Sequence, residues 1–439
     1  MEQFGRRDFL QLSAAWAAQS AIAHAAAAPP SGAEVSMVEP PGMPETARHW
    51  PGWRGPSGQG YVSGTGYVDT WSDGDGPSRN VVWKVETPGL GNSSPVVWGD
   101  RLFLTTAYED GARRSVLCFQ RSGGKLLWET PAPKATPEDA NRKNGHASGT
   151  PSTDGERVYA YLGNHGLLAV DFDGKVVWHK SFGEMNAYHG TSCSPLLYKD
   201  RVIVYQDHRG PGPSFVAAYD RRTGKQLWFN EREERVGWGS PVAIRAGSRE
   251  EIIVSSFKRV YGYDPAGGKE LWRCDGNLVE VTPTPVVGHG LIFCCSGRAG
   301  PTLAIRPGGS GDVTQSHVAW QTVKGSPFIP SPILDGDGLY IVNDMASIAT
   351  CFEAASGRLK WQGRLGEARR EGFSGSPVAV DGKVFFTNDA GETYVLAAGP
   401  EFKVLGVNRL NSRTLASPAA VDGRWYFRTE KHLLSIGKG

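Results

Sequence analysis

A Gly-Lys-x-x-Trp motif recurs along the chain, and each copy follows a Ser-Pro or Thr-Pro pair. One copy runs from Ser194 to Trp228 and divides into four short apolar runs, separated by turns rich in Gly, Pro, Asp and Lys. Four strands of this length cannot bury both faces of a sheet by themselves. The unit must therefore stack against further copies of itself.

The spacing of the copies identifies the kind of repeat. The prolines that open them are Pro95, Pro151, Pro195, Pro241, Pro285, Pro332, Pro377 and Pro418. The first and last are 323 residues apart, so the period is about 46 residues, close to the roughly 40–50 of four-stranded propeller blades. The closing tryptophans keep the same spacing, at Trp128, Trp178, Trp228, Trp272, Trp320 and Trp361, and Leu405 takes that place in the seventh copy.

The eighth copy is incomplete at its C-terminal end. It begins at Ser417 and stops at Ile436, before a fourth strand, whereas a strand-like run from Asn80 to Val85 precedes the first Ser-Pro pair. We therefore predict an all-β fold, an eight-bladed β-propeller of four-stranded antiparallel blades. In this fold the N-terminal strand completes the C-terminal blade and closes the ring, so that no sheet edge is left free.

The start of the chain has the features of a targeting segment. Arg6-Arg7-Asp8-Phe9-Leu10 fits a twin-arginine pattern, an Ala-rich stretch follows, and Ala23-His24-Ala25 suits cleavage. We assign residues 1–28 to a twin-arginine signal peptide and expect a periplasmic protein; the alternative is a chance basic N-terminus before a linker. Residues 29–79 are expected to form a strap whose tryptophans cover apolar surface, and residues 80–439 to form the propeller.

Composition excludes several classes of partner. Glycine (57) and proline (29) are abundant, as in a chain of many short strands. The net charge is only +2, and no sustained run of one sign indicates binding to nucleic acid or to a membrane surface. No run after the start is apolar enough to span a bilayer. The six cysteines are not spaced like a disulfide framework.

With these motifs the chain resembles the PQQ-like (pyrroloquinoline-quinone-like) β-propeller repeat family, over about residues 50–439. The resemblance rests on the Ser-Pro openings, on strands such as Arg157–Ala160, and on closing units such as Gly124–Trp128 and Gly268–Trp272. It implies that the tryptophans lie on the outermost strands and dock on the next blade. Two branches of the family differ in function: quinoprotein dehydrogenases hold PQQ and calcium, and BamB-like scaffolds use the ring as a binding surface.

Loops before the first strand of each blade and between its second and third strands converge on one face of a propeller. We expect a ligand or partner site there, formed by His146, His165, His189, Asp207, His208, Arg209, Trp238, Lys258 and Arg298. Such a set is suited to an anionic ligand, a polar substrate or a metal; the alternative is a solvated polar rim. The long crossover Pro131–Ser148, which carries Lys143, is a candidate lid over the channel mouth.

Cys294 and Cys295 close the second strand of the fifth repeat. The resemblance implies that adjacent cysteines can form a disulfide against PQQ, with calcium nearby. Strand residues alternate between faces, however, so two reduced thiols that point in opposite directions are the simpler state. No Glu/Asn/Asp set matches the calcium site that the resemblance implies, so no catalytic residue and no metal ligand is assigned.

The sequence is therefore interpreted as a periplasmic binding or scaffolding propeller without catalysis. Its partner would be a protein or a small polar ligand. Two alternatives stay open: a PQQ-dependent dehydrogenase, and a binder of small ligands or polysaccharide.

Overall fold

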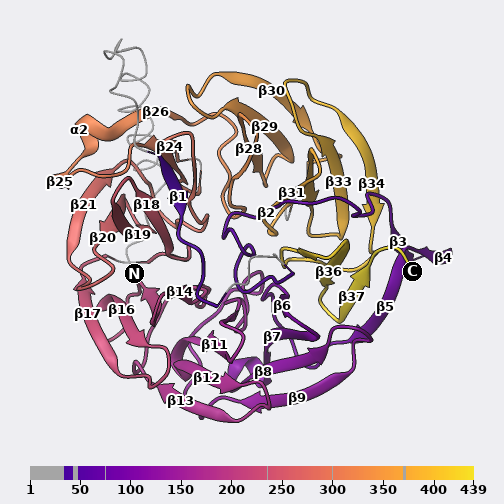
Figure 1. Cartoon of the computed structure of the whole chain (residues 1–439), viewed down its shortest axis with the longest axis horizontal. Coiled ribbons are helices and arrows are strands. Elements are labelled where there is room, and N and C mark those ends of the chain that lie inside the picture. Colours follow the sequence, from indigo (N-terminus) through magenta and orange to yellow (C-terminus); the bar gives the residue numbers. More distant parts are fainter. Residues whose placement is uncertain (1–33, 43–47, 75, 235, 299, 369–371) are drawn as a thin grey trace. The chain divides into compact units, whose positions relative to one another are not determined.

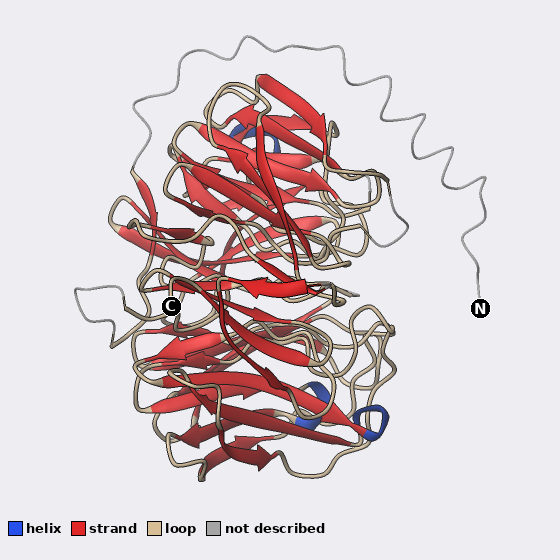
Figure 2. Ribbon diagram, turned by 90° about the vertical axis from the view of Figure 1, so that its right-hand side faces the viewer, coloured by secondary structure: helices blue, strands red, loops and turns tan. Residues whose placement is uncertain are grey.

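The computed structural model describes residues 34–42, 48–74, 76–234, 236–298, 300–368 and 372–439. Within the unit Glu34–Gly439, the strands form eight sheets that follow one another around a central channel (Figure 1). Among these described residues, helix is confined to short segments, which are η1 (Glu109–Gly111), η2 (Gly163–His165) and α2 (Thr314–His317) (Figure 2). The predicted signal peptide, residues 1–28, lies outside the described residues.

Each blade runs from the channel outward in chain order. The first four blades are β6–β9 (Val96–Trp98, Arg101–Tyr108, Arg113–Gln120, Leu126–Pro131), β10–β13 (Ser152–Thr153, Arg157–Tyr161, Leu167–Asp171, Val176–Lys180), β14–β17 (Leu196–Tyr198, Arg201–Gln206, Ser214–Asp220, Gln226–Arg232) and β18–β21 (Val242–Ala246, Arg249–Ser255, Arg259–Tyr263, Glu270–Asp275). The next three are β22–β24 with β26 (Val286–Gly288, Leu291–Cys295, Thr302–Ile305, Val318–Thr322), β27–β30 (Ile333–Asp335, Gly338–Asn343, Ile348–Glu353, Leu359–Arg364) and β31–β34 (Val378–Val380, Lys383–Thr387, Glu392–Ala397, Val404–Arg409).

The eighth blade joins the two ends of the propeller sequence. Its strands are β35 (Ala419–Val421), β36 (Arg424–Arg428), β37 (His432–Ile436) and β5 (Val81–Glu86). In the antiparallel pair β37·β5, Ser435 lies opposite Trp83 and Leu433 opposite Val85. The predicted fold class, including closure by an N-terminal strand, is confirmed.

The Ser-Pro and Thr-Pro pairs link the blades around the channel. In the first seven pairs, the backbone N–H of the residue before the proline donates to the hydroxyl of its counterpart in the next blade, over 2.8–3.2 Å. We call these seven hydrogen bonds the hydroxyl belt; its members are Ser94, Thr150, Ser194, Ser240, Thr284, Ser331, Ser376 and Ser417. At the seam between the eighth and first blades, the buried Arg428 donates to Ser93 Oγ (2.6 Å) and to the Thr105 carbonyl (2.7 Å).

The tryptophans link the blades at the outside, as the resemblance implied. Six indole N–H groups donate to a backbone carbonyl of the next blade over 2.9–3.1 Å; the pairs are Trp83 to Arg121, Trp128 to Phe172, Trp178 to Arg221, Trp228 to Pro265, Trp320 to Ala354 and Trp361 to Gly399. The Trp228 indole also covers Gly268, where an added Cβ would meet it at 2.5 Å and where φ is +74°. The glycine of the repeated motif therefore makes room for the neighbour's tryptophan.

Trp272 is the exception, and an insertion in the fifth repeat explains it. Residues 306–317 replace the short turn that would receive the indole. They form β25 (Gly311–Asp312), which pairs with the outer strand β21 of the fourth blade, and α2. Trp272 is fully buried and donates to Glu251 Oε2 (2.7 Å) in its own blade.

The strap enters the channel and does not stay on the outside. β1 (Val35–Met37) pairs with the innermost strand of the fourth blade, and β2 (Tyr61–Val62) with that of the seventh. Between them, Trp50 bridges to Val97, and the Trp53 indole donates to Thr284 of the hydroxyl belt (3.1 Å). Farther on, Trp71 is buried against Phe385, Trp425 and Phe427.

The crossover Pro131–Ser148 reaches across the opposite, upper face. This is the face where the loops before the first strand and between the second and third strands emerge. Asn144 donates to the His189 carbonyl of the third blade (2.8 Å), and Lys143 Nζ lies 3.0 Å from Asp389 Oδ2 of the seventh. The lysine thus connects loops that belong to distant blades.

Trp228→Ala is expected to lower the free energy of unfolding by about 3–5 kcal/mol, because the buried indole leaves a cavity and its hydrogen bond is lost. Denaturant titration measures this change. Leu227→Ala is the matched control, since Leu227 is 40% exposed, and should stay within about 0.5 kcal/mol of wild type. Equal effects from the two variants would contradict the docking role of the indole.

Asp389→Asn is expected to flatten the pH dependence of stability. Burial raises the pKa of Asp389 from 3.8 to about 6, against the opposing effect of Lys143. The protonated carboxyl therefore stabilises the folded protein fully below pH 3.8, and this stabilisation is lost as the pH rises through 6. For a pKa shift of this size, the free energy of unfolding falls by about 3 kcal/mol.

The measurement compares the free energy of unfolding of wild type and Asp389→Asn between pH 3.5 and pH 8, a range set to bracket both pKa values. The variant should gain on wild type as the pH rises. In Lys143→Met, which removes the opposing cation, the same loss should shift to higher pH. Parallel curves for wild type and Asp389→Asn would contradict the prediction.

Candidate functional site

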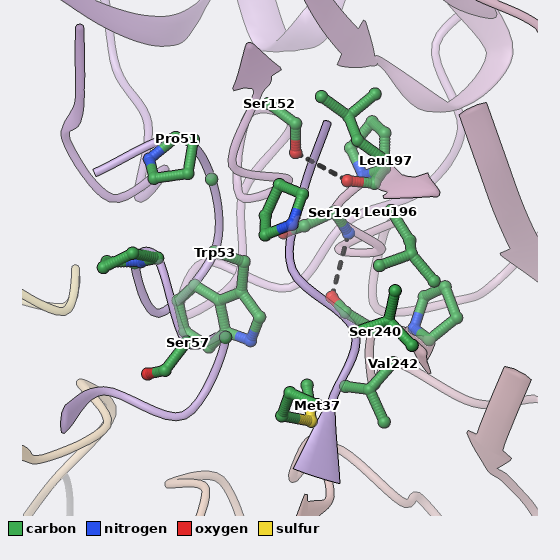
Figure 3. Close-up of a pocket in the computed structure, with 18 residues that line it drawn as sticks. Met37, Pro51, Trp53, Ser57, Ser152, Ser194, Leu196, Leu197, Ser240 and Val242 are labelled. Carbon is green, nitrogen blue, oxygen red and sulfur yellow. Dashed lines mark hydrogen bonds between the residues drawn. The ribbon is translucent and has the colours of Figure 1, made fainter. Parts of the chain in front are cut away.

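A cavity lies between the strap and the inner strands of the second, third and fourth blades (Figure 3). It is lined by Trp53 and Met37 of the strap, and by Ser152, Ser194 and Ser240. Its serines are occupied: Ser152 donates to the Pro195 carbonyl (2.6 Å), and Ser240 accepts from the Ser194 N–H (3.0 Å). The volume is about 60 Å³, room for a few water molecules and far below that of a typical ligand pocket.

The upper face carries a better candidate. Tyr188, His189, Trp238, Glu280 and Arg298 come together from three consecutive blades, and we call these five residues the upper-face site. The first four lie in loops that lead into the first strand of a blade, and Arg298 lies in the loop between β23 and β24. Loops on a rigid propeller hold such side chains in fixed relative positions.

Glu280 is the centre of the upper-face site. The Tyr188 hydroxyl donates to its Oε1 over 2.9 Å, and His189 Nε2 lies 3.9 Å from the same oxygen. Arg298 Nε is 2.8 Å from Oε2. The two groups form a close ion pair, but the Arg298 N–H does not point at the oxygen as it would in a hydrogen bond. The carboxylate therefore has a phenol, an imidazole and a guanidinium around it.

Aromatic packing supports these polar contacts from below. Trp238 is buried, and its indole donates to the Gly190 carbonyl over 2.8 Å. Tyr188 stands edge-on to Trp238, with ring centroids 5.4 Å apart, and His189 lies 5.5 Å from it. The Arg209 guanidinium lies 5.1 Å from the centre of the Tyr188 ring, a cation–π distance.

Two groups of the site, Tyr188 and His189, are neutral where they meet the Glu280 carboxylate. Burial, followed by the nearby Glu280 carboxylate, raises the pKa of Tyr188 well above its ordinary value. Burial lowers the pKa of His189, although Glu280 opposes this shift. At neutral pH the site thus offers a phenol and an uncharged imidazole. Arg209 and Arg298 supply positive charge at its edge.

Exposed apolar side chains lie in loops of the same face as the upper-face site. Val279, next to Glu280, is 43% exposed; Val323, in the loop toward the sixth blade, is 65% exposed; and Met345, in an upper loop of that blade, is 54% exposed. Arg298 also lies over the Phe328 ring at 5.5 Å. The upper face therefore carries exposed apolar side chains as well as charged groups, and protein–protein interfaces contain both.

The other predicted residues do not join this site. His165 is buried and contacts the Ala112 carbonyl (3.2 Å) through Nε2, while His146 Nδ1 lies 3.1 Å from Arg114 Nη2. Burial and the Arg114 charge lower the pKa of both histidines. The same arginine forms a buried bidentate ion pair with Glu138 (2.9 and 2.7 Å). This is a structural network inside the loops.

Asp207 and His208 are likewise used by the fold. The Asp207 carboxylate is buried and pairs with Arg232 over 2.8 and 3.1 Å. His208 Nδ1 accepts from the Gly210 N–H (3.0 Å), and its Nε2 contacts the Pro213 carbonyl (3.1 Å). Lys258 is exposed, 5.1 Å from the Phe257 ring, on the same face. The predicted rim is therefore divided into separate clusters.

Sequence reasoning missed Glu280, although a signal for it was present. His189 and Trp238 were identified because they precede a Ser-Pro pair. Glu280 stands in the same place before Thr284-Pro285, so the same rule applied to the fifth blade selects it.

Cys294 and Cys295 do not fit the role that the resemblance implies. Both thiols are free and fully buried. Cys294 packs in the core between the fourth and fifth blades, and Cys295 in the core between the fifth and sixth. Their side chains point to opposite faces of the blade, so they do not form a surface for a planar quinone. In the part of the chain that the structure describes, no group of three or more His, Cys, Asp or Glu is suited to a metal ion.

Among the described residues, no helix has the length and apolar character needed to cross a bilayer. One curated relative, the rhamnogalacturonan endolyase YesW of Bacillus subtilis (strain 168), is 26% identical over 205 residues, which are 42% of this chain. The chain spans about a third of the length of that relative, 32%.

Solved structures share the fold at low sequence identity. BamB from Moraxella catarrhalis is 15% identical, with a TM-score of 0.58 over 82% of this chain and 97% of that one. Quinohemoprotein alcohol dehydrogenase from Comamonas testosteroni is 11% identical, with a TM-score of 0.63 over 89% and 81%. A family model described as outer membrane protein assembly factor BamB matches residues 21–210 and 112–363. With its eight four-stranded blades, the chain belongs to this family of PQQ-like β-propellers.

Proposed function

We propose that the protein is a periplasmic binding or scaffolding propeller that takes a partner protein on its upper face. The observation that carries this proposal is the upper-face site with its charged centre, together with the exposed apolar side chains on the same face. Val279, Val323 and Met345 supply area that gains from burial. Arg209 and Arg298 would select a partner with acidic groups at matching positions.

The family to which the chain belongs supports a binding role. The matching family model is named for an assembly factor, and assembly factors act by contact. The match to a rhamnogalacturonan endolyase makes an acidic polysaccharide the main competitor for the same arginines. A partner protein and a polysaccharide can be distinguished, because a polysaccharide does not require the exposed side chains of Val279, Val323 and Met345.

The test is affinity purification of the full chain from its native periplasm, followed by quantitative mass spectrometry. Met345→Asp and Arg298→Glu are expected to reduce recovery of a specific partner protein at least about tenfold, the range of a moderate interface contact. Leu227→Asp is the matched control, because Leu227 is 40% exposed but lies on an outer strand. The control should capture the partner as wild type does.

Equal capture by all three variants would overturn the upper face as the docking surface. If Arg298→Glu loses binding to an acidic polysaccharide while Met345→Asp binds it as wild type does, the ligand of this face is the polysaccharide and not a partner protein. Reduced capture by the control as well would indicate general loss of folding, which circular dichroism of the purified variants detects.

The periplasmic location rests on the twin-arginine pattern at Arg6-Arg7. Replacement of both arginines by lysine is expected to leave the protein in the cytoplasm, because the twin-arginine pathway recognises the arginine pair. Cell fractionation measures this. A normal periplasmic yield from the double variant would exclude this route of export.

A further inference from the structure

Arg54 is a buried cation that has no counter-charge among the residues the structure describes. Its side chain belongs to the strap, and the residue is 2% exposed. None of its three guanidinium nitrogens has a hydrogen-bond acceptor among the described residues. This is unusual because a buried guanidinium normally finds acceptors for its N–H groups.

The other buried arginines of the described chain show what is missing. Arg114 is paired with Glu138 and Arg232 with Asp207. Arg428 donates to a hydroxyl and to carbonyl oxygens at the seam. Only Arg54, among these four, is left with all of its donors unused.

The described part of the chain supplies no negative charge beside Arg54. The titratable group that acts on it is Cys295, at the end of β23 in the fifth blade. Burial raises the pKa of that thiol to about 12, so it is neutral at physiological pH. Burial lowers the pKa of Arg54 only to about 9. The guanidinium therefore keeps its charge, and an isolated buried charge is strongly unfavourable.

The backbone holds the side chain in this position. Arg54 has φ of +61°, in the left-handed region, and its carbonyl accepts from the Gly60 N–H over 2.9 Å. At Gly60 an added Cβ would lie 2.9 Å from Arg54 Nη2 and 2.9 Å from the Pro377 carbonyl. The strap thus turns back on itself, and the absence of a Cβ at Gly60 lets the guanidinium approach the strap backbone near the seventh blade.

We propose that Arg54 binds a compact monoanion, a halide or a single carboxylate, inside the channel between the strap and the inner parts of the fifth and seventh blades. The planar fork of the guanidinium suits a carboxylate, and the enclosure of the site favours a small ion. The bound anion neutralises the buried charge. It also connects the strap to the fifth and seventh blades. The hydroxyl belt, by contrast, connects each of these blades only to its neighbouring blades.

The first test measures unfolding of the full chain by denaturant in bromide or formate, at constant ionic strength with methanesulfonate as the exchange anion. Above its dissociation constant, each tenfold rise in a bound anion should raise the folding equilibrium constant of wild type about tenfold. Arg54→Met should lose this dependence. Arg428→Met is the matched control, since it removes an equally buried arginine that has protein acceptors, and should keep it.

The second test does not require a stable variant. Crystals of wild-type protein grown in bromide should give an anomalous peak beside the Arg54 guanidinium, and prior exchange into formate should weaken it if a carboxylate competes. No peak, together with equal anion dependence in wild type and Arg54→Met, would overturn the proposal. A peak that formate leaves unchanged would restrict the site to halides.

Discussion

The hydroxyl belt is the interaction on which the propeller depends. Each of its bonds joins the N–H of one blade's innermost edge to a hydroxyl of the next, so the belt links all eight blades in sequence and is interrupted only at the seam. A serine or threonine is needed as the acceptor, and the proline that follows has no N–H to leave unsatisfied beside the channel. The Ser-Pro pair is therefore a connecting device of the blade. It carries no information about a ligand.

The outer and inner links join neighbouring blades at different distances from the channel axis. The tryptophans hold neighbouring blades together at the periphery, where an indole covers a turn glycine and donates to a carbonyl. The hydroxyl belt holds them at the axis. Where one link is absent, another contact replaces it: an insertion covers Trp272 in the fourth blade, and Arg428 bridges the seam. His189, Trp238 and Glu280 lie in the same loops as members of the belt but take no part in these two sets of links, which leaves them free to form a binding surface.

The fold could be predicted because its rules are periodic. The spacing of Ser-Pro pairs and tryptophans defined the blades, and the incomplete eighth repeat required the strand at Val81–Glu86. The site was less predictable, since loop membership does not determine side-chain direction. Asp207 turns inward to Arg232, whereas His189 and Trp238 meet Glu280, which was overlooked. Burial of a particular polar group depends on packing from several blades at once, and no repeat pattern contains that information.

The seam also constrains how the chain folds. β5 and its partner β37 lie at opposite ends of the propeller sequence. The eighth blade can therefore form only after Leu433 has been synthesised and can pair with Val85. Until then the early blades form an open arc with unpaired strand edges, which is a state prone to association with other chains. Contacts of such long sequence separation are slow to form. While the chain is still attached to the ribosome, β5 therefore has no β37 to pair with through almost the whole of synthesis.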